Sequence, residues 1–292
     1  MSKTQEATKM AATPHDLPSE FFQSIARLRR DIKTASVTLS DREARFLVDA
    51  YYQMQRDRIR AGHQERTLTE NAEPHDVLAW LGDQRSTLEK QIAGALDVYS
   101  NSLQIGRWAR SITGIGPIIA AGLVSNIDIK RAPTVGHIWR FAGLDPTVVW
   151  KANTKRPWNG ALKRLCFLIG ESFTKVSGRE SDVYGKVYVE RKALEMARNE
   201  AGAFAEQAAA SLAAKKWRDD TKARAAYEAG RLPQARIHLR AQRYATKLFL
   251  SHYHHVAYEI AHGAPPAKPY ILAKGDPLHT DFIGPPNWPM SD

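Results

Sequence analysis

The sequence has a single cysteine, Cys166, among its 292 residues. One thiol excludes an intramolecular disulfide framework and any zinc site built from several cysteines. No apolar run reaches the ~18 residues of a membrane span, and the polar N-terminus has no apolar core of a secretory signal. We therefore expect a cytoplasmic protein with no membrane partner.

Glycine-rich nucleotide loops are also missing: the chain has neither a Gly-x-x-x-x-Gly-Lys-Ser/Thr loop nor a dinucleotide fingerprint. We expect no cofactor. Hydrophobic residues make up 43% of the chain, which excludes a wholly disordered protein.

Alternating strand patterns are nearly absent, whereas apolar residues recur at helical spacing, so we predict an all-α fold. Seven of the 15 prolines lie in the last 31 residues, which favours an extended tail. The predicted order is a disordered N-terminus, a long helical hairpin or coiled-coil arm, a helical domain with a helical insertion, and a proline-rich tail: residues 1–16, 17–110, 111–262 with the insertion at about 176–233, and 263–292.

Within the arm, Ser40 and Glu43 form a capping box that begins a helix, which we expect to end near Gly62. Residues 63–75 are polar and are predicted to form a loop. A sparse apolar stripe predicts one helix over 76–110.

Later in the chain, helical spacing predicts an amphipathic helix over 159–173. The segment 183–229 is rich in Ala, Glu, Lys and Arg and is predicted to form one or two long helices. A last helix is predicted over 234–261.

The positive charge is unevenly distributed. The whole chain has a net charge of +11, and residues 111–256 hold 24 Lys and Arg against 12 Asp and Glu. A basic block confined to one region favours a polyanionic partner. The alternative is a solvated basic surface with no partner.

The most informative stretch is Thr113, Gly114, Ile115 and Gly116, followed by Pro117. Its two glycines allow a tight turn, Ile115 is expected to fill the space between the flanking helices, and Pro117 suits the first turn of a helix. Free amides at such a helix start suit a phosphate oxygen. We predict a helix-hairpin-helix motif in which these four residues contact phosphate. The alternative is a plain turn between core helices.

Ile118 and Ile119 follow, at positions where many such hairpins carry Lys or Thr. Exposure of these two side chains would favour a protein-facing role for the hairpin.

Residues 111–127, 128–131 (Asp-Ile-Lys-Arg) and 142–146 (Ala-Gly-Leu-Asp-Pro) carry a family resemblance. Together they resemble the C-terminal half of the insertion-sequence transposases that use a bridge RNA. The basic segments 155–164 and 236–250 are similar to that family's basic turn and final helix. The resemblance implies a nucleic-acid-handling domain, and it places the predicted arm where the family has a coiled coil.

Two elements of that family are missing here. Its N-terminal half is a RuvC-like nuclease, whereas residues 1–75 read as helical and are too short for that fold. Its nucleophilic serine follows the Ala-Gly-Leu-x-Pro stretch, whereas residues 147–154 contain no serine. The resemblance therefore implies a stand-alone phage or mobile-element relative without catalytic residues of its own.

Two groups of cations are candidate phosphate contacts. The first lies on one face of a helix with no acidic residue inside the run. The second accompanies Trp150 and Trp158, whose rings can stack on exposed bases or lie in the core. The groups are Arg236, Arg240, Arg243 and Lys247, and Lys151, Lys155, Arg156, Lys163 and Arg164.

Three other patterns receive structural interpretations. Cys166 lies in an apolar stripe and is expected to be a core thiol. His252 and His255 share a helix face with no cysteine or carboxylate beside them in sequence, so we predict no metal site. Tyr184 and Tyr188 lack the assembled Arg-His-Arg setting of a tyrosine recombinase, so no catalytic residue is assigned.

The sequence thus predicts a protein that binds nucleic acid, first of all DNA, without a catalytic centre of its own. Two alternatives stay open: an active transposase, recombinase or nuclease with an unrecognised site, and a protein-interaction module derived from a transposase. The expected partners are DNA or structured RNA, and a second copy of the chain joined through the helical arm.

Overall fold

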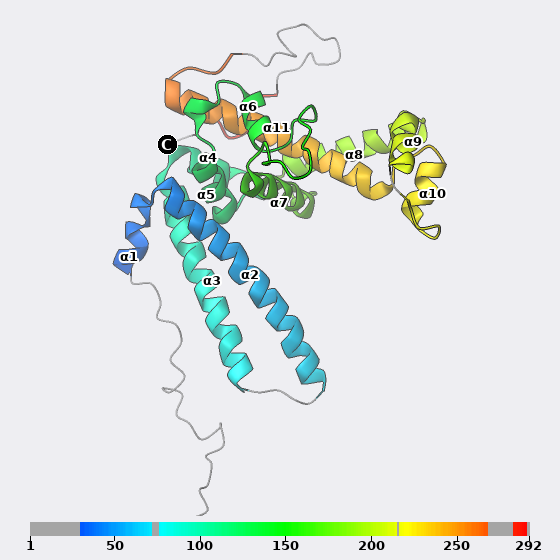
Figure 1. Cartoon of the computed structure of the whole chain (residues 1–292). Helices are drawn as coiled ribbons and strands as arrows, with labels where there is room; N and C mark the ends of the chain where they lie inside the picture. Colours follow the sequence, from blue (N-terminus) through cyan, green and yellow to red (C-terminus); the bar gives the residue numbers. More distant parts are fainter. Residues whose placement is uncertain (1–29, 72–75, 215, 268–282, 291–292) are drawn as a thin grey trace, which may run out of the picture.

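The structure, a computed structural model, describes residues 30–71, 76–214, 216–267 and 283–290 (Figure 1). Within these ranges the chain forms helices and turns and no strand, which confirms the all-α prediction. None of these helices combines the length and apolar character of a membrane span. The α-helices are α1 (Arg30–Ala35), α2 (Asp41–Glu70), α3 (Asp76–Ser102), α4 (Gln104–Ser111), α5 (Pro117–Asn126), α6 (Val135–Phe141), α7 (Gly160–Val176), α8 (Tyr184–Glu200), α9 (Ala205–Ala213), α10 (Lys222–Glu228) and α11 (Gln234–His262).

Helices α2 and α3 form an antiparallel arm that projects from the body (Figure 1). The predicted capping box is confirmed at its start, since the Glu43 amide donates to the Ser40 hydroxyl at 3.3 Å and the Ser40 amide donates to the Glu43 carboxylate at 2.8 Å. Farther along, Arg58 Nε donates to the buried Glu89 carboxylate at 2.6 Å. This pair fixes the register of the arm, because a shift would leave a buried charge without its partner.

Two predicted helix limits in the arm are wrong. Helix α2 continues past Gly62 to Glu70, so the first part of the predicted loop 63–75 is helical, and its last residues lie outside the described ranges. One glycine costs a helix about 1 kcal/mol, which packing against α3 outweighs. The predicted helix over 76–110 is interrupted at Leu103, where α3 ends and α4 begins.

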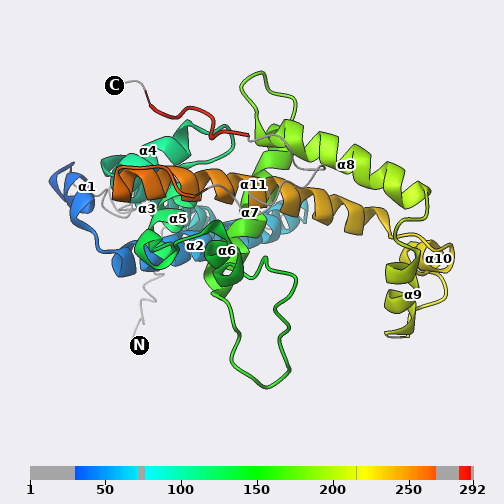
Figure 2. The ribbon, with the colours of Figure 1, turned by 90° about the horizontal axis from the view of Figure 1, so that it is seen from above.

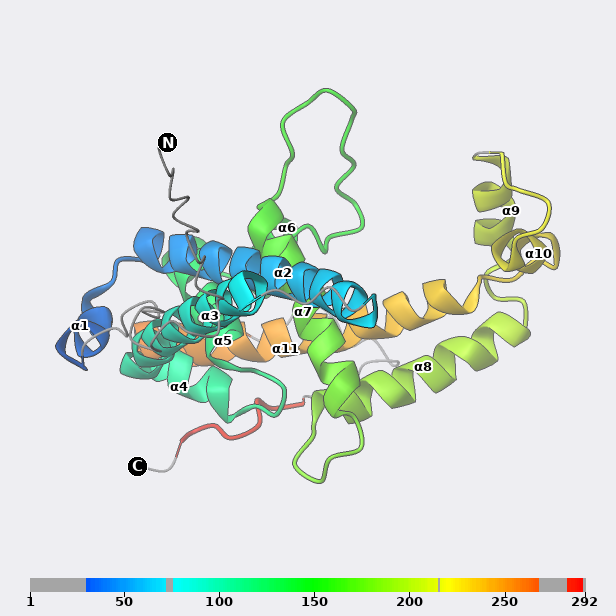
Figure 3. The same cartoon turned by 90° about the horizontal axis from the view of Figure 1, so that it is seen from below.

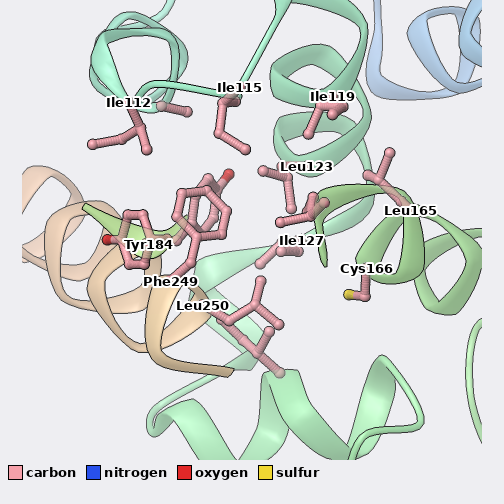
Figure 4. Packing of buried hydrophobic residues seen from close by; sticks show 14 of the residues in the cluster. Ile112, Ile115, Ile119, Leu123, Ile127, Leu165, Cys166, Tyr184, Phe249 and Leu250 are labelled. Atoms are coloured by element: carbon pink, nitrogen blue, oxygen red, sulfur yellow. The ribbon is translucent and has the colours of Figure 1, made fainter. Parts of the chain in front are cut away.

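Helix α5 lies at the centre of the molecule, with seven of its ten residues buried. It packs against α2 and α3 of the arm and against α4 and α7 of the body. Small residues permit this approach: a Cβ at Gly122 would lie 2.8 Å from a methyl group of Leu165. Ile119 and Leu123 of α5 point into the same core as Phe249 of α11 (Figure 4).

Helix α7 crosses the body beside α11, and the outer half of α11 pairs with α8 in a second projection (Figures 2 and 3). Gly202, with a φ of 79°, allows the chain to turn after α8. Helices α9 and α10 then form a small core of their own around Phe204 and Tyr227. The segment 183–229 therefore forms three helices, more than the one or two predicted.

Residues 283–290, the C-terminal strap, run without helix along α4 and α11. The strap reaches Ser111 at the end of α4, two residues before the predicted hairpin begins at Thr113. Its hydrogen bonds to the body include three from side-chain nitrogens: Trp108 Nε1 donates to the Pro286 carbonyl at 2.9 Å, Asn287 Nδ2 to the Ser111 carbonyl at 3.0 Å, and Trp288 Nε1 to the Glu259 carboxylate at 2.9 Å. The predicted disordered segment 1–16 and residues 268–282 of the predicted tail lie outside the described residues.

The break between α3 and α4 requires glycine at position 106. A Cβ there would overlap the carbonyl group of Ser100, so we expect Gly106→Ala to lower the free energy of unfolding by about 1–3 kcal/mol. Gly62→Ala is the matched control, because a Cβ there meets nothing within 4 Å. That variant should gain about 0.5–1 kcal/mol. Urea denaturation measures both values, and equal effects would contradict this account of the break.

Candidate nucleic-acid interface

The hairpin predicted from Gly-Ile-Gly lies between α4 and α5. Ile115 is 5% exposed and packs into the main core, as expected for the residue between the two helices (Figure 4). Gly114 adopts a φ of 98°, a conformation that favours glycine. The Ser172 hydroxyl of α7 donates to the Gly114 carbonyl at 2.5 Å, and the Thr113 hydroxyl donates to the Ser181 carbonyl at 3.0 Å. The bend is therefore held by the C-terminal end of α7 and by the loop that follows it.

The start of α5 presents free backbone donors. Gly116 is the exposed N-cap residue, with no side-chain cap, and Pro117 has no N–H group. Among the described residues, no acceptor is paired with the N–H groups of Ile118 and Ile119. The bend opens on a depression of about 730 Å³ between the arm and the end of α7, lined on its far sides by residues that include Tyr51, Gln55 and Arg179.

The side chains of Ile118 and Ile119 are buried, 8% and 9% exposed. Ile118 packs with Val48 and Leu96 of the arm, and Ile119 packs in the main core. The departure from the usual Lys or Thr thus has a structural reason, because these isoleucines join the arm to the body. They present no exposed apolar surface to a protein partner.

Members of both predicted groups of cations meet at the N-terminal end of α7: Arg156 and Lys163 of the second group, and Arg243 and Lys247 of the first. The Lys163 amine lies 3.9 Å from the ring centre of Trp158, and the Lys247 amine lies 3.9 Å from that of Trp139. The Arg156 guanidinium lies 5.5 Å from the ring of Trp150. We call the four cations Arg156, Lys163, Arg243 and Lys247, with these three tryptophans, the α7 cluster.

The cations of the α7 cluster repel one another. Partial burial lowers the pKa of Lys163, and the charges of Arg243 and Arg156 lower it further. Burial also lowers the pKa of Lys247, against the opposing effect of the Asp145 carboxylate. None of the four cations forms an ion pair with a described residue. A bound anion would offset this repulsion, so the cluster is electrostatically suited to phosphate.

The remaining predicted cations lie outside the α7 cluster. Arg240 Nε donates to the buried Glu195 carboxylate at 3.0 Å, and its guanidinium lies over Phe204. Glu195 of α8 supplies the acidic partner that the run on α11 lacks. Arg164 lies over the ring of Tyr52, facing the arm. Three further cations are exposed, two on the loop that joins α6 to α7 and one near the outer end of α11: Lys151, Lys155 and Arg236.

The hairpin and the α7 cluster lie at opposite ends of α7, since Ser172 near its C-terminus bonds Gly114 and Lys163 in its first turn lies over Trp158. Ser172, which holds the hairpin, and Lys163 are nine residues apart, or ~14 Å along the helix axis. The two groups therefore make two separate sites joined by one rigid helix.

Sequence reasoning missed Trp139, whose ring lies under Lys247 and whose Nε1 donates to the Lys247 carbonyl at 3.3 Å. The only feature of the sequence that pointed to Trp139 as a site residue was its position between the hairpin and the basic segment 155–164. It also missed the exposed Arg179, which lines the depression at the hairpin.

Of the residues interpreted as structural, Cys166, His252, Tyr184 and Tyr188 are buried, whereas His255 is half-buried and lies 3.5 Å from the Glu259 carboxylate. Cys166 is 3% exposed, and burial raises the pKa of its thiol to about 12. His252 accepts at Nδ1 from the Tyr184 hydroxyl at 2.7 Å and donates from Nε2 to the Ile283 carbonyl of the strap at 2.9 Å. A carbonyl only accepts, which assigns the proton of the neutral ring to Nε2. No group of three or more metal-ligating side chains occurs among the described residues.

The part of the chain that holds the hairpin is similar to one protein family. Residues 107–164 match the model described as the Transposase IS116/IS110/IS902 family. The match runs from α4 through the hairpin and α5 to the first turn of α7. It supports a relationship to transposases over this segment, where the sequence motifs predicted one. Neither the curated proteins nor the solved structures include a match to this chain.

The burial of His252 makes stability depend on pH. Burial lowers its pKa to about 4 from an ordinary value of 6.5. Between these values the unfolded chain binds a proton that the folded chain does not, so stability falls as the pH drops from 6.5 to 4, by up to about 3 kcal/mol.

His252→Gln should flatten this dependence, measured by urea denaturation from pH 4.5 to 7.5. Some slope should persist, because burial also lowers the pKa of His254. His63→Gln, at an exposed position on the arm, is the control and should keep the wild-type slope. A wild-type slope in His252→Gln would rule out this assignment.

Proposed function

We propose that the protein binds the sugar–phosphate backbone of nucleic acid, first of all DNA, without a catalytic centre of its own. In this view it is a relative of insertion-sequence transposases, of the kind found in phages or mobile elements. The observation that carries the proposal is the α7 cluster: four cations, none of them in an ion pair with a described residue, gathered at one end of α7 and overlapping the segment similar to transposases.

Charge and geometry favour phosphate at this cluster. Lys163 and Lys247 are held over tryptophan rings at 3.9 Å, which limits the conformational entropy lost on binding. The charge of Arg243 acts on both lysines, since it lowers the pKa of each. Cations that are already ordered and that repel one another gain more free energy on binding a polyanion than freely solvated cations do.

The hairpin is proposed as a second phosphate contact. The exposed Gly116 and the free amides at the start of α5 face an open depression, and Arg179 at its edge adds positive charge. A helix start of this kind favours an anion through both its N–H groups and the helix dipole.

The partner is DNA or structured RNA in this proposal, and a homodimer through the arm remains a prediction. The protein-interaction alternative is less favoured, because Ile118 and Ile119 are buried rather than exposed.

Salt dependence tests the cluster. Each phosphate contact on duplex DNA contributes about −0.9 to the slope of log affinity against log salt concentration. We expect Lys163→Ala combined with Arg243→Ala to make that slope about 1.8 units less steep, measured by filter binding at several salt concentrations.

Two variants serve as controls. Arg60→Ala removes an exposed cation of the arm, and Arg240→Ala removes a cation that pairs with Glu195. Both should keep the wild-type slope. An unchanged slope in the double variant would remove the cluster from the interface.

A charge change at Gly116 tests the hairpin. A Cβ there meets nothing within 4 Å, so Gly116→Ala should fold and bind like wild type. Gly116→Glu places a carboxylate at the mouth of the bend and should weaken duplex binding about tenfold relative to Gly116→Ala, or ~1.4 kcal/mol. Equal affinities of the two variants at low salt would exclude the hairpin.

A further inference from the structure

We infer that the loop joining α6 to α7, residues 142–159, binds unpaired bases, so that the preferred ligand is nucleic acid with a single-stranded stretch. This inference rests on the proposed function and names the ligand class of the same site. The loop stands out from the body at the N-terminal end of α7 (Figures 2 and 3).

The loop holds an indole ring in solvent. Trp150 is 42% exposed and its neighbour Val149 is 81% exposed. Trp150 Nε1 donates to the Thr154 carbonyl at 2.8 Å, within the loop. The only polar atom of the indole is thus paired internally, which leaves the aromatic surface as the part available to a ligand.

Internal hydrogen bonds define the conformation of this loop. The Asp145 carboxylate accepts from the Thr147 hydroxyl at 2.7 Å, and the Thr154 hydroxyl donates to the Lys151 carbonyl at 2.7 Å. The Trp158 ring packs edge-on against Trp150, with 6.5 Å between ring centres. An aromatic side chain held in place loses little entropy when a base stacks on it.

The charges beside Trp150 specify the partner. The Arg156 guanidinium lies 5.5 Å from the Trp150 ring, and Lys151 and Lys155 are exposed on the same loop. An aromatic ring among cations is the arrangement that binds single strands, because the cations follow the phosphates while bases stack on the ring. In a duplex the base faces are stacked on one another and are not available to the loop.

The experiment compares three labelled probes of equal length by fluorescence anisotropy on the full chain: single-stranded DNA, single-stranded RNA of the same sequence, and duplex DNA. We expect the wild type to bind a single-stranded probe at least about fivefold more tightly than the duplex, and the two single-stranded arms show which sugar is preferred.

Trp150→Ala should weaken single-strand binding about 5- to 100-fold and change duplex affinity less than about twofold. Trp150→Phe keeps a stacking ring and should retain most of the affinity, which separates stacking from folding. Trp80→Ala is the matched control, since Trp80 is 38% exposed on α3 of the arm.

The experiment distinguishes failure of this inference from failure of the proposed function. Salt-dependent binding of all probes with no single-strand preference, or a Trp150→Ala effect equal on single strand and duplex, overturns this inference and leaves the proposed function standing. Salt-independent or absent binding of every probe overturns the proposed function and this inference together.

Discussion

The burial of α5 on all sides is the constraint on which the other elements depend. A ten-residue helix with seven buried residues has almost no surface for water, so its neighbours must approach closely from several directions. Alanines at 120 and 121 and the glycine at 122 make that approach possible. The same helix begins at the hairpin, so the packing that fixes the core also fixes the backbone donors at its N-terminus.

Helix α7 carries functional polar side chains at both of its ends. Its C-terminal half holds the bend through Ser172, and its first turn presents Lys163 over Trp158. Its middle is buried against α11, where Ile169 and Phe173 are fully covered. The helix therefore sets the distance between the two sites, and a ligand that reaches both must span it.

Local signals account for what the sequence predicted well. The capping box at Ser40, the burial of Ile115 and the burial of Cys166 follow from residues a few positions apart in the chain. Helix limits were less accurate, because α2 continues past Gly62 along α3 and because the chain breaks between α3 and α4, where a Cβ at position 106 would overlap the Ser100 carbonyl.

The features that sequence reasoning missed come from distant segments. Trp139 and Lys247 are 108 residues apart, and Arg240 finds Glu195 45 residues earlier in the chain. The strap likewise meets α4 across 178 residues at Trp108. Helical periodicity does not specify pairs so far apart in the chain. The pairing of Arg240 with Glu195 and the placement of Lys247 over Trp139 therefore could not be predicted from the sequence.

The seating of Ile118 between α2 and α3 has a mechanical consequence. Helix α2 has 30 residues and is therefore ~45 Å long. Its first part packs on α5 through Ala44 and Val48, and farther out Arg58 joins it to Glu89 of α3. The direction in which the arm leaves the body is thus set at its base, by the side chains packed around Ile118.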